Sequence, residues 1–148
     1  MHTIERQALL RAPRGRVWNA LTDIKKFCEW FGVSPVDGEF KPGAKVRMRA
    51  PKEYGGDFDI MVEQMQPEHL FTWRWHPGAR DESVDYEKEP TTLVEFKLVE
   101  TAGGTLLTIT ESGFDNISLA RRARVFGENS QGWEEQLKNL ERYVNKTS

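Results

Sequence analysis

Residues 118–144 read SLARRARVFGENSQGWEEQLKNLERYV, and the apolar residues of this stretch recur at helical spacing. They are Leu119, Phe126, Trp133, Leu137, Leu140 and Val144. Three small residues, Ala123, Gly127 and Ser130, are predicted to share the same face. We therefore expect one long C-terminal helix with a hollow beneath the middle of its buried face.

The seventy residues before this stretch alternate between apolar and polar side chains, a pattern typical of strands. Together with an N-terminal segment they predict about six strands, over residues 3–10, 46–49, 58–63, 70–75, 92–98 and 105–111. Pro13 is typical of a helix start, and Thr22-Asp23 predicts the cap of a second short helix. A long helix that follows an antiparallel sheet buries its apolar face most simply by lying across it, so the expected class is α+β.

Several short segments carry a resemblance that covers most of the chain. They are APRGRVWNALTD at 12–23, WF at 30–31, FTW at 71–73, TLLTITESGF at 105–114 and GW at 132–133. In order and spacing they resemble the activator of Hsp90 ATPase homologue-like family of the START-like, helix-grip superfamily. The resemblance implies a single helix-grip domain over residues 1–148, in which a curved sheet, two short helices and the long helix enclose a ligand cavity. It implies no catalytic residues, because fold alone does not determine chemistry here.

The composition excludes several classes of partner. With 21 basic and 23 acidic residues the net charge is −2, which does not favour binding to nucleic acid. No apolar run is long enough for membrane insertion, and the charged N-terminus lacks the apolar core of a signal peptide. A single cysteine, Cys28, suits a reducing compartment. We expect a cytoplasmic protein.

The sequence offers no metal or cofactor motif. His2, His69 and His76 are the only histidines, and none has a partner at metal-ligand spacing. The sequence contains no phosphate-binding loop, dinucleotide fingerprint or nucleophile elbow. We therefore expect no metal, no cofactor and no catalytic residue of a recognised type.

The predicted ligand-binding residues point toward the hollow or lie at its mouth. They are Trp30, Met48, Trp73, Trp75, Phe96, Glu111, Phe126 and Ser130. Glu111 continues the inward alternation of the last strand, so its carboxylate is expected either to orient a ligand or to reach water at the strand end. A desolvated carboxylate of this kind would make Glu111→Gln stabilising. Trp30 either contacts ligand or packs against a neighbouring loop.

The remaining predicted lining residues have simpler alternatives. Trp73, Phe96 and Phe126 also suit a plain core, and Met48 suits an adaptable one. Ser130 on the buried stripe indicates space beneath the helix, because a filled core would favour leucine there.

The predicted function is non-covalent binding of a small, largely apolar molecule in the cavity. Two alternatives stay open: a chaperone-interacting, stress-response domain, and a cyclase or dehydratase that uses Glu111 as acid or base. The protein partner would then be a chaperone or, in a homodimer, a second copy of the chain. Residues 77–90 form an acidic irregular segment that is typical of a flap or a functional rim.

Overall fold

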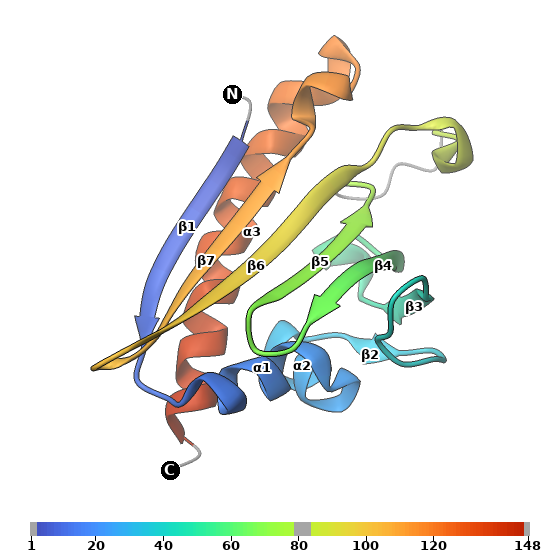
Figure 1. Ribbon diagram of the computed structural model, residues 1–148. Coiled ribbons are helices and arrows are strands. Elements are labelled where there is room, and N and C mark those ends of the chain that lie inside the picture. Colours follow the sequence, from blue (N-terminus) through green and yellow to red (C-terminus); the bar gives the residue numbers. More distant parts are fainter. Residues whose placement is uncertain (1–2, 79–83, 147–148) are drawn as a thin grey trace.

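A computed structural model describes residues 3–78 and 84–146 and shows one seven-stranded antiparallel sheet with a long helix across one face (Figure 1). The strand order is β1-β7-β6-β5-β4-β3-β2. The strands are β1 (Thr3–Leu10), β2 (Ser34–Pro35), β3 (Lys45–Arg49), β4 (Phe58–Gln66), β5 (Leu70–Trp75), β6 (Thr92–Thr101) and β7 (Gly104–Ser112). The expected α+β helix-grip class is confirmed. The strand beyond the expected six is β2, which has two residues and is too short to show alternation.

Three α-helices and three short 3-10 helices complete the fold. They are α1 (Arg14–Thr22), α2 (Ile24–Phe31), α3 (Leu119–Lys146), η1 (Lys52–Tyr54), η2 (Tyr86–Lys88) and η3 (Phe114–Asn116). The Asp23 carboxylate accepts hydrogen bonds from the backbone N–H groups of Lys25 and Lys26 and so caps α2. Gly32, with φ of 83°, ends α2 in the left-handed conformation that favours glycine.

The register of β6 and β7 sets the inner face of the sheet. Phe96 pairs with Ile109 and Val94 pairs with Glu111, and all four side chains are buried. Gly104 begins β7 with φ of 138°, and a Cβ atom there would collide with the backbone oxygen of Leu10. The β6–β7 turn therefore packs directly on the end of β1, and Glu111 lies near the opposite end of β7.

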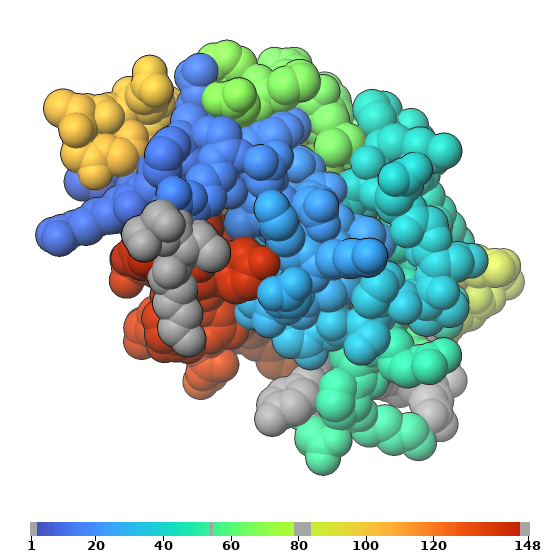
Figure 2. All heavy atoms as spheres, turned by 90° about the horizontal axis from the view of Figure 1, so that it is seen from below, coloured from blue at the N-terminus to red at the C-terminus, as the bar shows by residue number. Residues whose placement is uncertain are grey.

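The sheet is only partly covered by α3. A bulge between Val62 and Gln64 interrupts the β4–β5 register, and bulges of this kind increase local twist and bend the strand. Helix α3 packs against β1, α1 and α2. The segment with η1 lies on the same side of the sheet as α3 (Figures 1 and 2). Residues of α3, β3 and β4 line a cavity between the helix and this part of the sheet.

One end of this space is closed by helices. In the view from below, α1 and α2 lie beside the C-terminal turns of α3 and cover that end of the molecule (Figure 2). Phe27 of α2 is fully buried and contacts the rings of Trp30, Phe40 and Trp73. In the described residues, none of the helices has the length and apolar character needed to cross a membrane.

Candidate functional site

A buried carboxylate at the end of β7 organises the site. Glu111 is 0% exposed, and its Oε2 accepts hydrogen bonds from Trp75 Nε1 at 2.8 Å and Thr92 Oγ1 at 2.5 Å. Its Oε1 accepts from Trp133 Nε1 at 2.8 Å. The Asn129 amide donates to both oxygens, at 2.9 and 3.0 Å. Side chains from β5, β6 and α3 therefore converge on one group of β7.

The hydrogen bonds to Glu111 all come from neutral side chains within the described residues. A buried charge is costly unless hydrogen bonds replace its hydration, and here both oxygens are well supplied with donors. These hydrogen bonds favour a loss of stability in Glu111→Gln instead of the expected gain, because a glutamine would place an N–H group against these donors. The carboxylate acts on the site through the side chains that it holds.

The Asn129 side chain also ties the segment after β5 to α3. Its Oδ1 accepts a hydrogen bond from the Gly78 backbone N–H at 3.0 Å. Gly78 has φ of 81°, and a Cβ atom there would lie 2.7 Å from Cγ1 of Val125. The chain can approach the helix this closely only with glycine at this position. Of the predicted flap at 77–90, residues 79–83 lie outside the described residues.

A cavity of about 510 Å³ opens beside this network, between α3 and the β3–β4 part of the sheet. Four aromatic rings form its apolar wall, contributed by Phe31, Phe58, Trp75 and Trp133. Trp75 and Trp133 are stacked with 5.7 Å between ring centroids, and Phe58 meets Trp75 edge-on at 5.7 Å. Gly132 of α3 also faces the cavity, and a Cβ atom there would meet nothing within 4 Å. The wall is therefore continuous and leaves free space over the helix.

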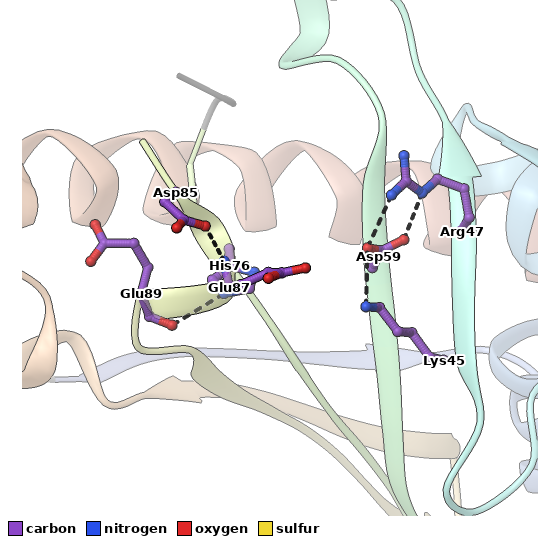
Figure 3. A network of polar contacts seen from close by, with 7 residues as sticks. All are labelled: Lys45, Arg47, Asp59, His76, Asp85, Glu87 and Glu89. Atoms are coloured by element: carbon purple, nitrogen blue, oxygen red, sulfur yellow. Dashed lines mark hydrogen bonds and ion pairs between the residues drawn. The ribbon is translucent and has the colours of Figure 1, made fainter. Parts of the chain in front are cut away.

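Polar and charged groups surround the aromatic wall. The other lining residues are Lys45, Arg47, Glu53, Gly55, Gly56, Asp57, Asp59, His76, Gly78, Tyr86, Glu87, Glu128, Asn129 and Gln136. Asp59 of β4 pairs with Arg47 at 2.7 Å and with Lys45 at 3.8 Å (Figure 3). On the opposite side, His76 Nε2 lies 3.2 Å from the Glu89 carbonyl oxygen (Figure 3). The cavity thus has an apolar interior and a charged rim.

Of the eight predicted ligand-binding residues, Trp75 is in the lining of this cavity. Glu111 lies directly behind the wall, where it holds Trp75 and Trp133. Trp73 and Phe96 are fully buried beneath the wall. Their ring centroids lie 6.3 and 5.7 Å from that of Trp133. These residues support the cavity from below, and ligand contact by them stays a prediction.

Trp30 and Met48 pack in the core near α2. Trp30 is 4% exposed, and its Nε1 donates a hydrogen bond to the Ala20 carbonyl oxygen at 2.8 Å. Met48 is fully buried, with its sulfur 3.7 Å from that of Cys28. Burial raises the pKa of the Cys28 thiol from 9.0 to about 11. Trp30 thus packs in the core against α1 and not against a loop, and any ligand contact by Trp30 or Met48 stays a prediction.

The predicted phase of the long helix is wrong in its first half. Leu119 is 81% exposed, and Ala123 and Gly127 are exposed, whereas Val125 is fully buried. The buried line passes through Val125 and Trp133. Helix α3 begins beyond the end of β7 (Figure 1), where Leu119 points to solvent while Arg121 of the same turn pairs with Glu89 at 2.6 Å. A hollow under small residues of the stripe is therefore not the reason for the cavity.

The corrected phase of α3 also changes the position of Phe126 and Ser130. Phe126 packs edge-on against Phe114 at 5.0 Å, and the Ser130 hydroxyl accepts a hydrogen bond from Arg6 Nη2 of β1 at 2.6 Å. Both lie on the flank of α3 away from the cavity lining. Sequence reasoning missed the opposite flank, with Asn129, Gly132 and Gln136. Glycine and asparagine are unfavourable inside helices, and this was the available signal.

The described residues hold no group of three or more His, Cys, Asp or Glu side chains placed to bind a metal ion.

Comparison with known proteins gives a family and a fold. The family model for "Activator of Hsp90 ATPase homolog 1-like protein" matches residues 11–145. No curated protein matches the chain. Among solved structures, protein MLL2253 from Mesorhizobium loti is 23% identical with a TM-score of 0.76, covering 99% of this chain and 98% of that one.

Two further structures agree with this fold. Protein CV1439 from Chromobacterium violaceum has 20% identity and a TM-score of 0.74, over 97% of this chain and 96% of that one. The Aha1 dimer from Colwellia psychrerythraea has the same identity, TM-score and coverage of both chains. At this level of identity, the similarities show the fold alone.

Proposed function

The chain belongs to the Activator of Hsp90 ATPase homolog 1-like family, and we propose that it binds a small, largely apolar molecule non-covalently in the cavity beside α3. One observation carries the proposal: a continuous wall of four aromatic rings lines a cavity of about 510 Å³. Cavities of roughly 300–1,000 Å³ with apolar walls and few polar groups are typical of small-molecule sites.

The wall is preorganised for binding. Trp75 and Trp133 cannot turn freely, because each donates its indole N–H to the buried Glu111 carboxylate. The rings of Trp73 and Phe96 support them from the core side. Because these rings are already fixed, little free energy is lost in ordering them when a ligand binds. Most of the gain from apolar burial, about 25 cal/mol per Å², therefore contributes to affinity.

Two glycines of α3 provide a matched test of the cavity. Gly132 lines it and Gly127 is exposed outside it, and an added Cβ atom meets nothing within 4 Å at either position. Leucine at each position gains helix propensity relative to glycine, so both variants should fold. Only Gly132→Leu places a side chain in the cavity.

The assay is fluorescence titration with Nile red, a neutral apolar dye. We expect the wild-type protein and Gly127→Leu to bind the dye with similar affinity. Gly132→Leu should bind it at least tenfold more weakly. Native mass spectrometry of freshly purified protein tests for a co-purified small molecule in the same samples. Absence of dye binding, or equal binding by both leucine variants, would overturn the proposal.

A second candidate is a protein partner, and the family match is the observation that favours it. The proposed partner is a chaperone ATPase or, because the Colwellia psychrerythraea protein is described as a dimer, a second copy of the chain. A pull-down with a purified Hsp90-type chaperone tests the first, and light scattering after size-exclusion chromatography tests the second. We propose a single domain acting in the cytoplasm, which suits the unpaired Cys28.

A further inference from the structure

The charges that line the cavity are unequal. The lining has five carboxylates, of Glu53, Asp57, Asp59, Glu87 and Glu128, and two basic side chains, of Lys45 and Arg47. Arg124, outside the lining, pairs with Glu128 at 3.1 Å, so the carboxylates still outnumber the basic groups by two. Both basic groups of the lining are engaged by one carboxylate, that of Asp59 (Figure 3). The remaining acidic groups stand on different sides of the rim, in the η1 segment, in η2 and on α3.

Two of these carboxylates are available to a ligand. Glu53 and Glu87 form no ion pair with any residue of the described ranges. In Figure 3 the Glu87 side chain extends from η2 toward the strand that carries Asp59. A cation in the cavity would therefore have acidic groups on both sides of it. Both carboxylates are exposed, so their attraction for a cation is screened by solvent and weakens as the salt concentration rises.

The indole and amide N–H donors of the lining are already used, and the basic groups of Lys45 and Arg47 both pair with Asp59. The indole N–H groups of Trp75 and Trp133 and the Asn129 amide N–H point to Glu111 behind the wall. Gln136 donates to the Phe31 carbonyl oxygen at 2.9 Å. An anionic or strongly accepting ligand would therefore have to displace bonds that the protein already makes.

The aromatic wall adds an attraction of the same sign. The indole N–H groups of Trp75 and Trp133 point to Glu111 and the two rings are stacked on each other, so these rings offer the cavity no indole donor. Aromatic faces attract cations through the ring quadrupole, and tryptophan is the strongest of the side chains in this respect. An aromatic wall and an acidic rim are thus both compatible with a cationic group in the ligand.

We propose that the ligand of this cavity is a molecule with an apolar body and a cationic group, a protonated or quaternary amine. The inference rests on the proposed function, and it names the ligand class of that same cavity. The apolar body would lie along the four rings, and the cationic group would lie at the rim near Glu53 and Glu87.

The test compares three compounds of the same shape in displacement of Nile red at about pH 8. They are (1-naphthylmethyl)trimethylammonium, its neutral carbon isostere 1-neopentylnaphthalene, and the anion 1-naphthylmethanesulfonate. We expect the cation to bind about tenfold more tightly than the isostere and the anion to bind more weakly than both. Raising the salt concentration should reduce only the preference for the cation.

Variants identify the groups responsible. Glu87→Gln should weaken binding of the cation about threefold and leave the neutral isostere unchanged. The matched control is Glu135→Gln, on an exposed part of α3 outside the lining, which should change neither. Equal affinity for cation and isostere, or equal effects of the two variants, would overturn the charge preference. If Nile red binds and Gly132→Leu blocks it, that failure leaves the proposed function standing; if neither the dye nor any compound binds, both fail.

Discussion

Replacing Glu111 by glutamine tests whether the buried carboxylate supports the fold. The change removes one acceptor oxygen and introduces an amide N–H group. Oε2 receives the Trp75 indole N–H and Oε1 receives the Trp133 indole N–H. In either orientation of the new amide, one indole donor therefore faces another donor.

The expected cost follows from that geometry. One unsatisfied buried donor costs about 1–3 kcal/mol, and the Asn129 bond to the same atom is weakened as well. Removing the charge from the interior offsets part of this loss. We therefore expect a net loss of about 1–3 kcal/mol in the free energy of unfolding, equivalent to a melting temperature lower by roughly 2–12 °C for a chain of this size.

Thermal unfolding followed by circular dichroism measures the effect, and Nile red titration measures the state of the wall. Glu95→Gln is the control, because Glu95 lies on the outer face of β6 and its replacement removes the same charge without touching the network. The control should melt within about 1 °C of the wild-type protein. A melting temperature of Glu111→Gln equal to or above that of the wild-type protein would refute the structural role of the carboxylate.

Three further predictions concern other parts of the fold. Ser130→Ala removes the hydrogen bond from Arg6, so denaturant unfolding should show a loss of about 0.5–1.5 kcal/mol while Nile red binding is unchanged; loss of dye binding would contradict the placement of Ser130 outside the cavity. Gly78→Ala should lower the free energy of unfolding by about 1–3 kcal/mol, because its Cβ atom would meet Val125. Gly43→Ala, at a similar φ of 86° in open space, should lower it less, and equal losses would mean that the contact with α3 is unimportant. Burial raises the pKa of Cys28 to about 11, so in the folded protein iodoacetamide at about pH 8 should alkylate it at least tenfold more slowly than in urea, and equal rates would contradict the burial.

Ionisation of Cys28 should make the stability of the fold fall as the pH rises. Its folded pKa of about 11 lies above the ordinary value of 9.0, so burial of the neutral thiol stabilises the fold below about pH 9. This contribution is lost as the pH rises from about 9 toward 11. The accompanying loss of stability should be smaller in Cys28→Ala, since alanine does not ionise.

Local patterns in the sequence determined most of the secondary structure. Alternation predicts that Val94, Phe96, Leu107 and Ile109 face inward, and all four are buried. The cap at Asp23 is also a local signal, because a side chain there reaches only the backbone of the next turn. These features could be predicted since each depends on residues that are neighbours along the chain or one strand apart.

The position of the cavity was decided by tertiary structure. The phase of α3 depends on where the helix leaves the sheet, and this leaves Leu119 in solvent and turns Gly132 to the cavity. No pattern along the chain indicates that Trp75, Asn129 and Trp133 would all donate to Glu111, because those residues meet only when β5, α3 and β7 are packed together. The sequence by itself determined the elements and the inward direction of Glu111. Only the packing of distant elements decided that this carboxylate would bind its neighbours and hold the wall of a cavity.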